Sequence, residues 1–285
     1  MRLAVLADIH GNLPALEAVL ADLHTHTPDA VYLLGDQVNR CPWNNEVLDL
    51  LATQGWPALQ GNHEYVIGII RTAQNHAPFT SQTHYPTEWW TQAQLHPHYL
   101  TQMRNLPAEH SVNLPGCAPL RLVHGVPGNA FIGFYPGSAT AYVVDLLRTV
   151  DEAYLICAHT HRPLVRQVDR WWIFNGGSVG MPYNGDPRAH YLLLDWVDHH
   201  WQPTLRQVDY DHTGLAAAFA ASGFLAEVGP MAQLHLRTVL TGHPWSSDFG
   251  YWRHTQPAPL QHDLERALEV YLQSHGPGQW AFPEG

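Results

Sequence analysis

The sequence predicts an α/β fold built around parallel β-strands, and two observations carry this prediction. Short apolar runs alternate with segments whose apolar residues recur at helical spacing through the first half of the chain. Five short polar blocks follow these runs, at the points where strands should end. In open α/β sheets, ligands gather beyond the carboxyl ends of the strands. The 285 residues are enough for one large domain with an added region.

The first elements are expected in the order strand, helix, strand. Residues 3–7 form a short apolar run typical of a buried strand, and residues 13–23 have helical spacing, with Asn12 as N-cap and Pro14 in the first turn. A second strand is expected at 30–34, a helix at 45–51 and a third strand at 56–59. Units of this length imply right-handed crossovers and parallel pairing.

The middle of the chain returns to strands after a break. Strands are expected at 120–123 and 153–157, with a helix at 139–147 between them. Residues 164–168 and 171–174 resemble a hairpin, and 191–195 with 202–208 form a second antiparallel pair. These pairs predict a mixed rather than purely parallel arrangement.

Two regions do not show this alternation of strands and helices, and both are expected to be helical. Residues 71–105 are rich in amide, histidine and aromatic side chains, and we expect a helical insertion or lid beside the site. Residues 211–285 are expected to form a C-terminal helical appendage on the main domain, residues 1–210, with helices at 214–222, 229–240 and 260–275 and a loop at 241–259. Trp89 and Trp90 of the insertion are candidates for stacking on a nucleobase, with core packing as the alternative.

Composition excludes several classes of protein. Apolar residues make up 45% of the chain and no run is long enough for a membrane span. The net charge is −11 and all 14 basic residues are arginine, so long nucleic acids are not expected as partners. The three widely spaced cysteines predict no disulfide framework, and without a recognisable signal peptide we expect a cytoplasmic protein. The sequence does not indicate the oligomeric state.

The five polar blocks contain a set of metal-ligand side chains. Carboxylate and amide oxygens mixed with imidazoles suit divalent transition ions. Two such ions about 3.5–4 Å apart are a recurring device for in-line attack on phosphorus. The sequence therefore predicts a hydrolase acting on phosphoesters, with seven candidate ligands: Asp8, His10, Asp36, Asn62, His124, His159 and His161.

The order of these blocks resembles the calcineurin-like metallophosphoesterase superfamily. The segments at residues 8–12 and 175–180 are most similar to its small bacterial and archaeal phosphodiesterase branch. The resemblance covers residues 1–195 and rests on the motifs Asp-x-His, Gly-Asp, Gly-Asn-His-Glu, His-Gly and Ala-His-x-His. It implies an α/β sandwich of two stacked mixed β-sheets flanked by helices, with a di-metal centre at the edge of the sheets.

The resemblance also assigns the ligands to two ions. Asp8, His10 and His161 would hold the first ion, and Asn62, His124 and His159 the second. Asp36 would bridge both through its carboxylate oxygens. The cofactors would be two divalent ions among manganese, iron, zinc and nickel, with manganese favoured, and a metal-bridging hydroxide would attack phosphorus.

Three further residues are candidates for contact with substrate. His63 resembles the family's non-ligand histidine, which would donate a proton or hydrogen bond to the leaving oxygen; a packed histidine in a turn is the alternative. Arg40 is a candidate phosphate clamp, with an ordinary surface arginine as the alternative. Asn12 is a candidate substrate contact as well as an N-cap. Glu64 would orient a ligand or His63 through a hydrogen bond, with a salt bridge or the start of a helix as the alternative.

The expected substrate is a small phosphoester or a nucleotide, acted on by a phosphodiesterase or phosphatase. The alternative is a non-catalytic scaffold with the same fold, since one member of the superfamily serves as a coat-complex subunit; here all seven ligands and His63 are present. A metal amidohydrolase also uses His-x-His, but on its first strand, whereas His159 and His161 come last in this series.

Overall fold

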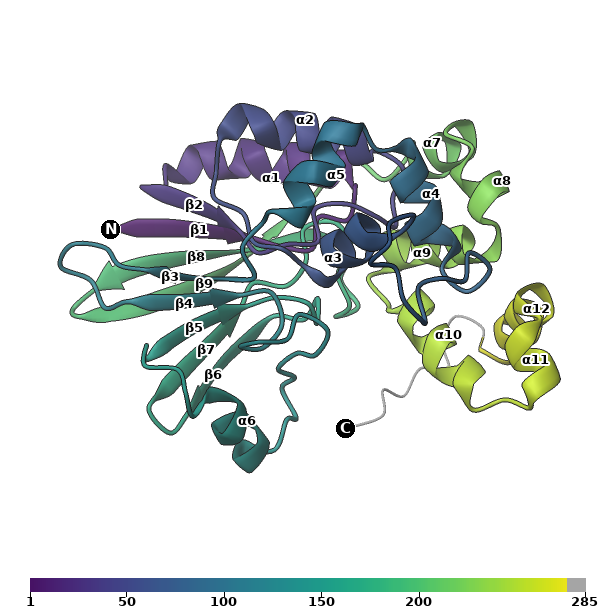
Figure 1. Ribbon diagram of the computed structural model, residues 1–285. Helices are drawn as coiled ribbons and strands as arrows, with labels where there is room; N and C mark the ends of the chain where they lie inside the picture. Colours follow the sequence, from purple (N-terminus) through teal and green to yellow (C-terminus); the bar gives the residue numbers. More distant parts are fainter. Residues whose placement is uncertain (276–285) are drawn as a thin grey trace.

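Two mixed β-sheets stack face to face in the computed structural model, which describes residues 1–275 (Figure 1). The first sheet has the order β2-β1-β8-β9, with β1 (Arg2–Leu6), β2 (Ala30–Leu33), β8 (Ala189–Val197) and β9 (His200–Val208). The second has the order β3-β4-β5-β7-β6, with β3 (Glu109–Val112), β4 (Leu120–Val123), β5 (Tyr154–Cys157), β6 (Leu164–Val168) and β7 (Trp171–Asn175). The predicted fold class is confirmed.

Alternation along each strand explains the layers. In β1, Leu3 and Val5 point into the core between the two sheets, whereas Ala4 and Leu6 point to the outer face. That outer face is covered by α1 (Leu13–His26) and α2 (Asn44–Gln54), and α6 (Thr140–Leu147) covers the outer face of the second sheet (Figure 1). Strands buried on both faces read as continuous apolar runs, which is why β1 and β5 were recognisable.

Parallel pairing brings the strand ends to one edge of each sheet. β1 pairs with β2 in parallel, and β4 with β5.

The predicted strand at 56–59 is wrong as an element: only Ala58 forms a single bridge, to Leu33. Pro57 has no N–H to donate, so the chain keeps two hydrogen bonds to Leu33 and then turns away.

Helices of the insertion cover the side of the molecule nearest the strand ends (Figure 1). They are α4 (Pro86–Gln94) and α5 (Pro97–Arg104), and they pack beside α3 (Asn62–Ile69), which precedes the insertion and carries the Gly-Asn-His-Glu motif. Ile67, Tyr99 and Met103 form a small core with residues of the main domain.

The C-terminal region consists of helices, as expected, but its central segment was predicted wrongly. Its elements are α7 (Leu215–Ala221), α8 (Phe224–Val228), α9 (Pro230–Thr241), α10 (Trp245–His254), α11 (Ala258–His262) and α12 (Leu264–Ser274). The expected loop at 241–259 contains α10, because Trp245 and Phe249, one turn apart, are buried against Leu268. The expected helix at 260–275 is interrupted at Asp263, whose carboxylate caps α12.

A shared core joins these helices to the rest of the protein. Phe219 and Phe224 pack in one cluster with Trp90 of the insertion and with Met181 and Tyr183 of the main domain. The division at residue 210 stays a prediction, and residues 276–285 of the expected appendage lie outside the described residues. Among the residues described, no helix is both long and apolar enough to cross a membrane.

Candidate metal centre

The seven predicted ligands come together at the edge where the parallel strands end. Asp8 and His10 follow β1, and Asp36 follows β2, all in the first sheet. His124 follows β4, and His159 and His161 follow β5, in the second sheet, while Asn62 begins α3. The site therefore lies across the junction of the two sheets.

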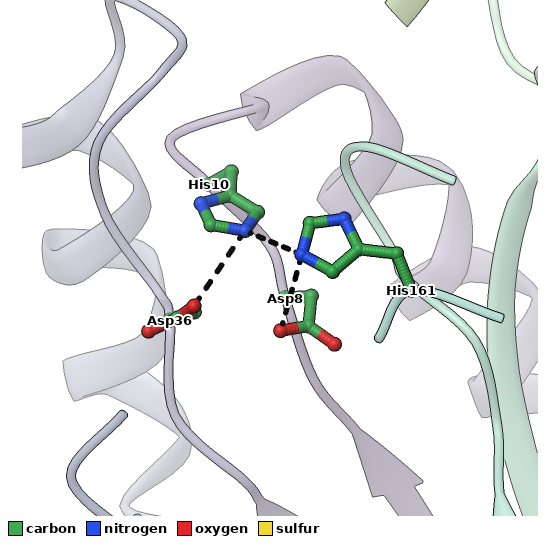
Figure 2. A group of neighbouring side chains, drawn as sticks. All are labelled: Asp8, His10, Asp36 and His161. Atoms are coloured by element: carbon green, nitrogen blue, oxygen red, sulfur yellow. Dashed lines mark hydrogen bonds and ion pairs between the residues drawn. The ribbon is translucent and has the colours of Figure 1, made fainter. Parts of the chain in front are cut away.

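One group of four side chains can hold a metal ion: Asp8, His10, Asp36 and His161 (Figure 2). His10 Nε2 lies 3.0 Å from His161 Nε2 and 3.7 Å from Asp36 Oδ2. His161 Nε2 lies 3.5 Å from Asp8 Oδ1. Ligands bonded at about 2.1 Å are about 3.0–3.4 Å apart around an octahedral or tetrahedral ion, so one ion fits after these side chains move together by a few tenths of an ångström.

A second group consists of Asp36, His124 and His159. His124 Nε2 lies 3.3 Å from Asp36 Oδ2, and both this nitrogen and His159 Nδ1 face the amide oxygen of Asn62, at 3.0 and 2.9 Å. The two groups share Asp36 alone. A carboxylate can bridge two cations, whereas an imidazole cannot.

Backbone carbonyls fix the orientation of two of these imidazoles. His124 Nδ1 donates to Leu34 O at 2.6 Å, and His161 Nδ1 donates to Met181 O at 2.5 Å. The lone pair of each ring therefore resides on Nε2, which points into the cluster. Such partners set the tautomer of metal-ligating histidines.

The oxygen and nitrogen atoms of the candidate ligands that face one another favour a positive charge between them. His124 Nε2 faces the oxygens of Asp36 and Asn62, an arrangement that requires a proton or a metal ion between them, and the buried Asp8 Oδ1 has no hydrogen-bond partner among the described residues. Burial would lower the pKa of His124, yet Asp36 raises it to about 10. The cluster therefore favours a cation at this position, and its residues fit divalent metal ions.

Strained backbone accompanies this geometry. Five of the seven ligands adopt a positive φ of 52° to 67°, namely Asp8, His10, Asp36, His159 and His161. Non-glycine residues seldom adopt this conformation, which costs about 1–3 kcal/mol each and is concentrated at functional sites. The surrounding structure must hold these residues in place.

Glu64 provides part of that support. Its buried carboxylate accepts backbone hydrogen bonds from Asp36 and Gly61 through Oε2, and from Gln37 through Oε1, at 2.7–2.8 Å. It thus joins the turn after β2 to the start of α3. A Cβ at Gly61 would overlap the Asp36 carboxylate, so the close approach requires glycine. Glu64 therefore supports a candidate ligand and the start of α3.

The loop after β7 supports the other side of the site. Ser178 Oγ donates to Asp8 O at 2.7 Å, and Asn175 Nδ2 donates to Ala158 O at 3.0 Å. A Cβ at Gly180 would overlap the carbonyl of Ile9. This glycine-rich loop therefore passes close beneath the candidate ligands.

His63 lies beside the ligands with its proton-bearing nitrogen toward them. Thr91 donates its hydroxyl to Asn39 Oδ1, so Asn39 turns Nδ2 toward His63 Nδ1, at 2.7 Å. Nδ1 accepts, and Nε2 carries the proton 3.9 Å from Asp36 Oδ2. Burial lowers the pKa of His63 to about 3, although Asp36 opposes this. His63 is thus a neutral hydrogen-bond donor facing the cluster.

Arg40 is half-buried at the edge of the centre. Its Nη1 donates to the hydroxyl of Tyr183, whose ring stacks on His161 with centroids 4.2 Å apart. No carboxylate forms an ion pair with Arg40 among the described residues. Its charge is therefore available to an anion.

Asn12 performs the structural one of its two predicted roles, and its contact with substrate stays a prediction. Its Oδ1 caps α1 by accepting from Ala15 N at 3.2 Å, and its Nδ2 donates to Gly180 O and Tyr210 OH. The side chain is fully buried, with both ends of the amide in use.

The two tryptophans of the insertion pack within the protein. Trp90 is buried against Phe224 and donates to Glu227, and the half-buried Trp89 donates to Phe79 O. Neither lines the cavity beside the centre. Trp90 therefore packs in the core, as the alternative prediction had it. No contact in the structure supports stacking of either ring on a base.

Sequence analysis missed three residues beside the centre: Asn39, Glu88 and Tyr183. Asn39 holds the tautomer of His63, Glu88 accepts from Asn39 at 3.2 Å, and Tyr183 orients Arg40. Asn39 lies three residues after Asp36, and that proximity was the only signal in the sequence. Glu88 and Tyr183 come from segments without a recognisable motif.

Fold and site together define a metal-dependent phosphoesterase architecture, and comparison with known proteins agrees. The calcineurin-like phosphoesterase superfamily domain matches residues 1–199. The chain therefore belongs to this superfamily, as the sequence motifs predicted. The match ends in β8–β9, so the helices after residue 210 lie beyond it.

Relatives of similar overall structure occur in bacteria and archaea. A metallophosphoesterase from Sphaerobacter thermophilus is 24% identical, with a TM-score of 0.68 over 85% of this chain and 99% of that one. A hypothetical protein from Pyrococcus horikoshii is 22% identical, with a TM-score of 0.70 over 85% and 98%. An uncharacterized protein of Methanocaldococcus jannaschii is 26% identical over 73% of this chain and 88% of its own length.

Proposed function

We propose that the protein hydrolyses small phosphoesters or nucleotides with two divalent metal ions. The observation that carries the proposal is the position of Asp36, whose carboxylate belongs to both ligand groups. Asp8, His10 and His161 complete the first site, and Asn62, His124 and His159 the second. Manganese is the favoured ion, with iron, zinc and nickel as alternatives.

The charge of the site favours an anionic substrate. Asp8 and Asp36 contribute two negative charges, and the other five ligands are neutral amide or imidazole groups. Two divalent ions would leave a positive surplus that attracts phosphate, and they would supply the activated nucleophile.

His63 and Arg40 would act on the phosphoryl group directly. His63 would donate a hydrogen bond from Nε2 to the leaving oxygen as negative charge develops there. Arg40, held by Tyr183 and unpaired with any described carboxylate, would bind a non-bridging oxygen of the phosphate.

An assay with defined metals tests the proposal. Protein freed of metal and reloaded with manganese, iron, zinc or nickel is supplied with phosphomonoesters, phosphodiesters and nucleotides. We expect turnover that depends on the metal and is lost with a chelator and in Asp36→Asn. If the folded, metal-loaded protein turns over none of these esters, the proposed hydrolase activity is refuted and a non-catalytic scaffold is favoured.

A further inference from the structure

A cavity of about 430 Å³ lies between the insertion and the C-terminal helices. It is lined by residues around the start of α4, by residues of α9, α10 and α11, and by Arg40. The match to the superfamily domain does not extend to the C-terminal walls of this cavity. The cavity therefore lies partly outside the superfamily domain.

Two lining residues connect the cavity to the metal centre. Arg40 is held by Tyr183, whose ring stacks on the candidate ligand His161. Glu88 accepts a hydrogen bond from Asn39 and lies 3.9 Å from His63 Nδ1. The cavity thus adjoins the side of the centre on which His63 lies. A hydrogen bond from His63 to the leaving oxygen places the leaving group on that side.

The lining is cationic although the chain as a whole carries −11. It contains the guanidinium groups of Arg40 and Arg253 against the single carboxylate of Glu88. The guanidinium of Arg253 lies 5.7 Å from the Phe249 ring centroid and forms no ion pair or side-chain hydrogen bond with the described residues. Burial lowers the pKa of Arg253, since its charge is not compensated. An anion would compensate it.

Two buried polar atoms of the lining also lack partners. Ser246 is 6% exposed and His235 is 3% exposed. Ser246 Oγ and His235 Nδ1 have no hydrogen-bond partner among the described residues, while His235 Nε2 bonds to Thr87 at 3.1 Å. A buried polar group without a partner is costly, so these atoms point to a bound ligand with polar oxygens.

We propose that this cavity binds a second phosphate, carried by the leaving group of the substrate. Arg253 would supply a charge-assisted bond, with Ser246 and His235 as further donors. The inference rests on the proposed function, because the metal centre must bind the first phosphate. It makes the preferred substrate a phosphoester whose leaving group is itself phosphorylated.

Direct binding separates this proposal from catalysis. Metal-loaded protein is titrated in a calorimeter with alkanediol bisphosphates of increasing chain length, each compared with the monophosphate of the same chain. At one chain length we expect the bisphosphate to bind about 10- to 100-fold more tightly, as for a charge-assisted bond. Equal affinities at every length would overturn the proposal.

Variants identify the group that recognises the second phosphate. Arg253→Gln should reduce the ratio of the two affinities to near one, and Ser246→Ala should reduce it severalfold. Because Ser246 Oγ has no hydrogen-bond partner among the described residues, Ser246→Ala should leave the melting temperature unchanged or raised. Arg266→Gln, an exposed residue of α12 outside the cavity, is the matched control and should retain the full ratio.

The two proposals can fail separately. Tighter binding of bisphosphates without hydrolysis of any ester would refute the proposed function and leave the second phosphate site standing. Metal-dependent hydrolysis without this preference, or a ratio that survives Arg253→Gln and Ser246→Ala, would refute the second phosphate site alone.

Discussion

Asp36 is the residue on which both metal groups depend. Asp36→Asn removes the shared anionic bridge, so we expect the protein to lose both ions, measured by elemental analysis after dialysis. Asn62→Ala should mainly empty the second site, because Asn62 contacts only His124 and His159 of the ligand set. Asp145→Asn, on the surface of α6, is the control. Full metal content in Asp36→Asn would contradict the bridging arrangement.

His63 is expected to matter for turnover but not for metal binding. His63→Ala should retain both ions and lower kcat by about 10²–10⁴-fold. Since p-nitrophenolate leaves readily without assistance, the loss should be greater for an alkyl or ribose leaving group. Equal losses for the two classes would mean that His63 stabilises charge on phosphorus or holds the site together.

At the scale of single residues, the sequence motifs indicated the candidate ligands more readily than the residues that surround them. The seven ligands occur in short motifs with recognisable donor atoms, and the structure brings all of them together. Asn39 and Glu88 could not be found in this way, because their importance comes from contacts across the insertion. Asn12 illustrates the reverse case: its position in a motif suggested substrate contact, yet its amide is fully used by the fold.

Among the elements, Asp22 of α1 is the clearest link between a helix and the first sheet. Its carboxylate accepts from Tyr191 of β8 at 2.7 Å and from Arg206 of β9 at 2.8 Å. Asp22→Asn should therefore lower the free energy of unfolding by about 1–3 kcal/mol, measured in urea at neutral pH. The control is Asp145→Asn, whose exposed ion pair contributes little.

The pH dependence of this effect has a definite sign. Burial alone would raise the pKa of Asp22, but hydrogen bonds from Arg206 and Tyr191 lower it below 3.8. The stabilisation is thus complete above the unfolded pKa and is lost as pH falls through the folded pKa. The difference in stability between the wild-type protein and Asp22→Asn should shrink on acidification. A difference that grows would contradict the assignment.

Strands and helices were predictable to different degrees for a physical reason. Strands buried on both faces, such as β1 and β5, are continuous apolar runs and were located closely. In contrast, α10 has Gly250 and two serines within it, and its helical state comes from packing of Trp245 and Phe249. Tertiary contacts outweighed local propensity there, so the sequence alone suggested a loop.

For the whole molecule, the shared core predicts that the C-terminal helices are required for stability. Phe224→Ala should cost about 3–5 kcal/mol, because this fully buried ring packs on Trp90 and Phe219. Tyr251→Ala, 73% exposed, is the control and should have little effect. Unfolding in denaturant measures both. A small effect of Phe224→Ala would mean that these helices are a dispensable addition.

The placement of the ligands on two different sheets has a consequence for the order of folding. Each group combines residues of the first sheet with residues of the second, and Asp8 and His161 are far apart in the chain. Neither sheet alone carries a complete set, so high-affinity metal binding has to follow the docking of the sheets. During refolding with cobalt, the visible absorption of the bound ion should thus appear after the burial of tryptophan. A bound ion would then link the two sheets and slow their separation during unfolding.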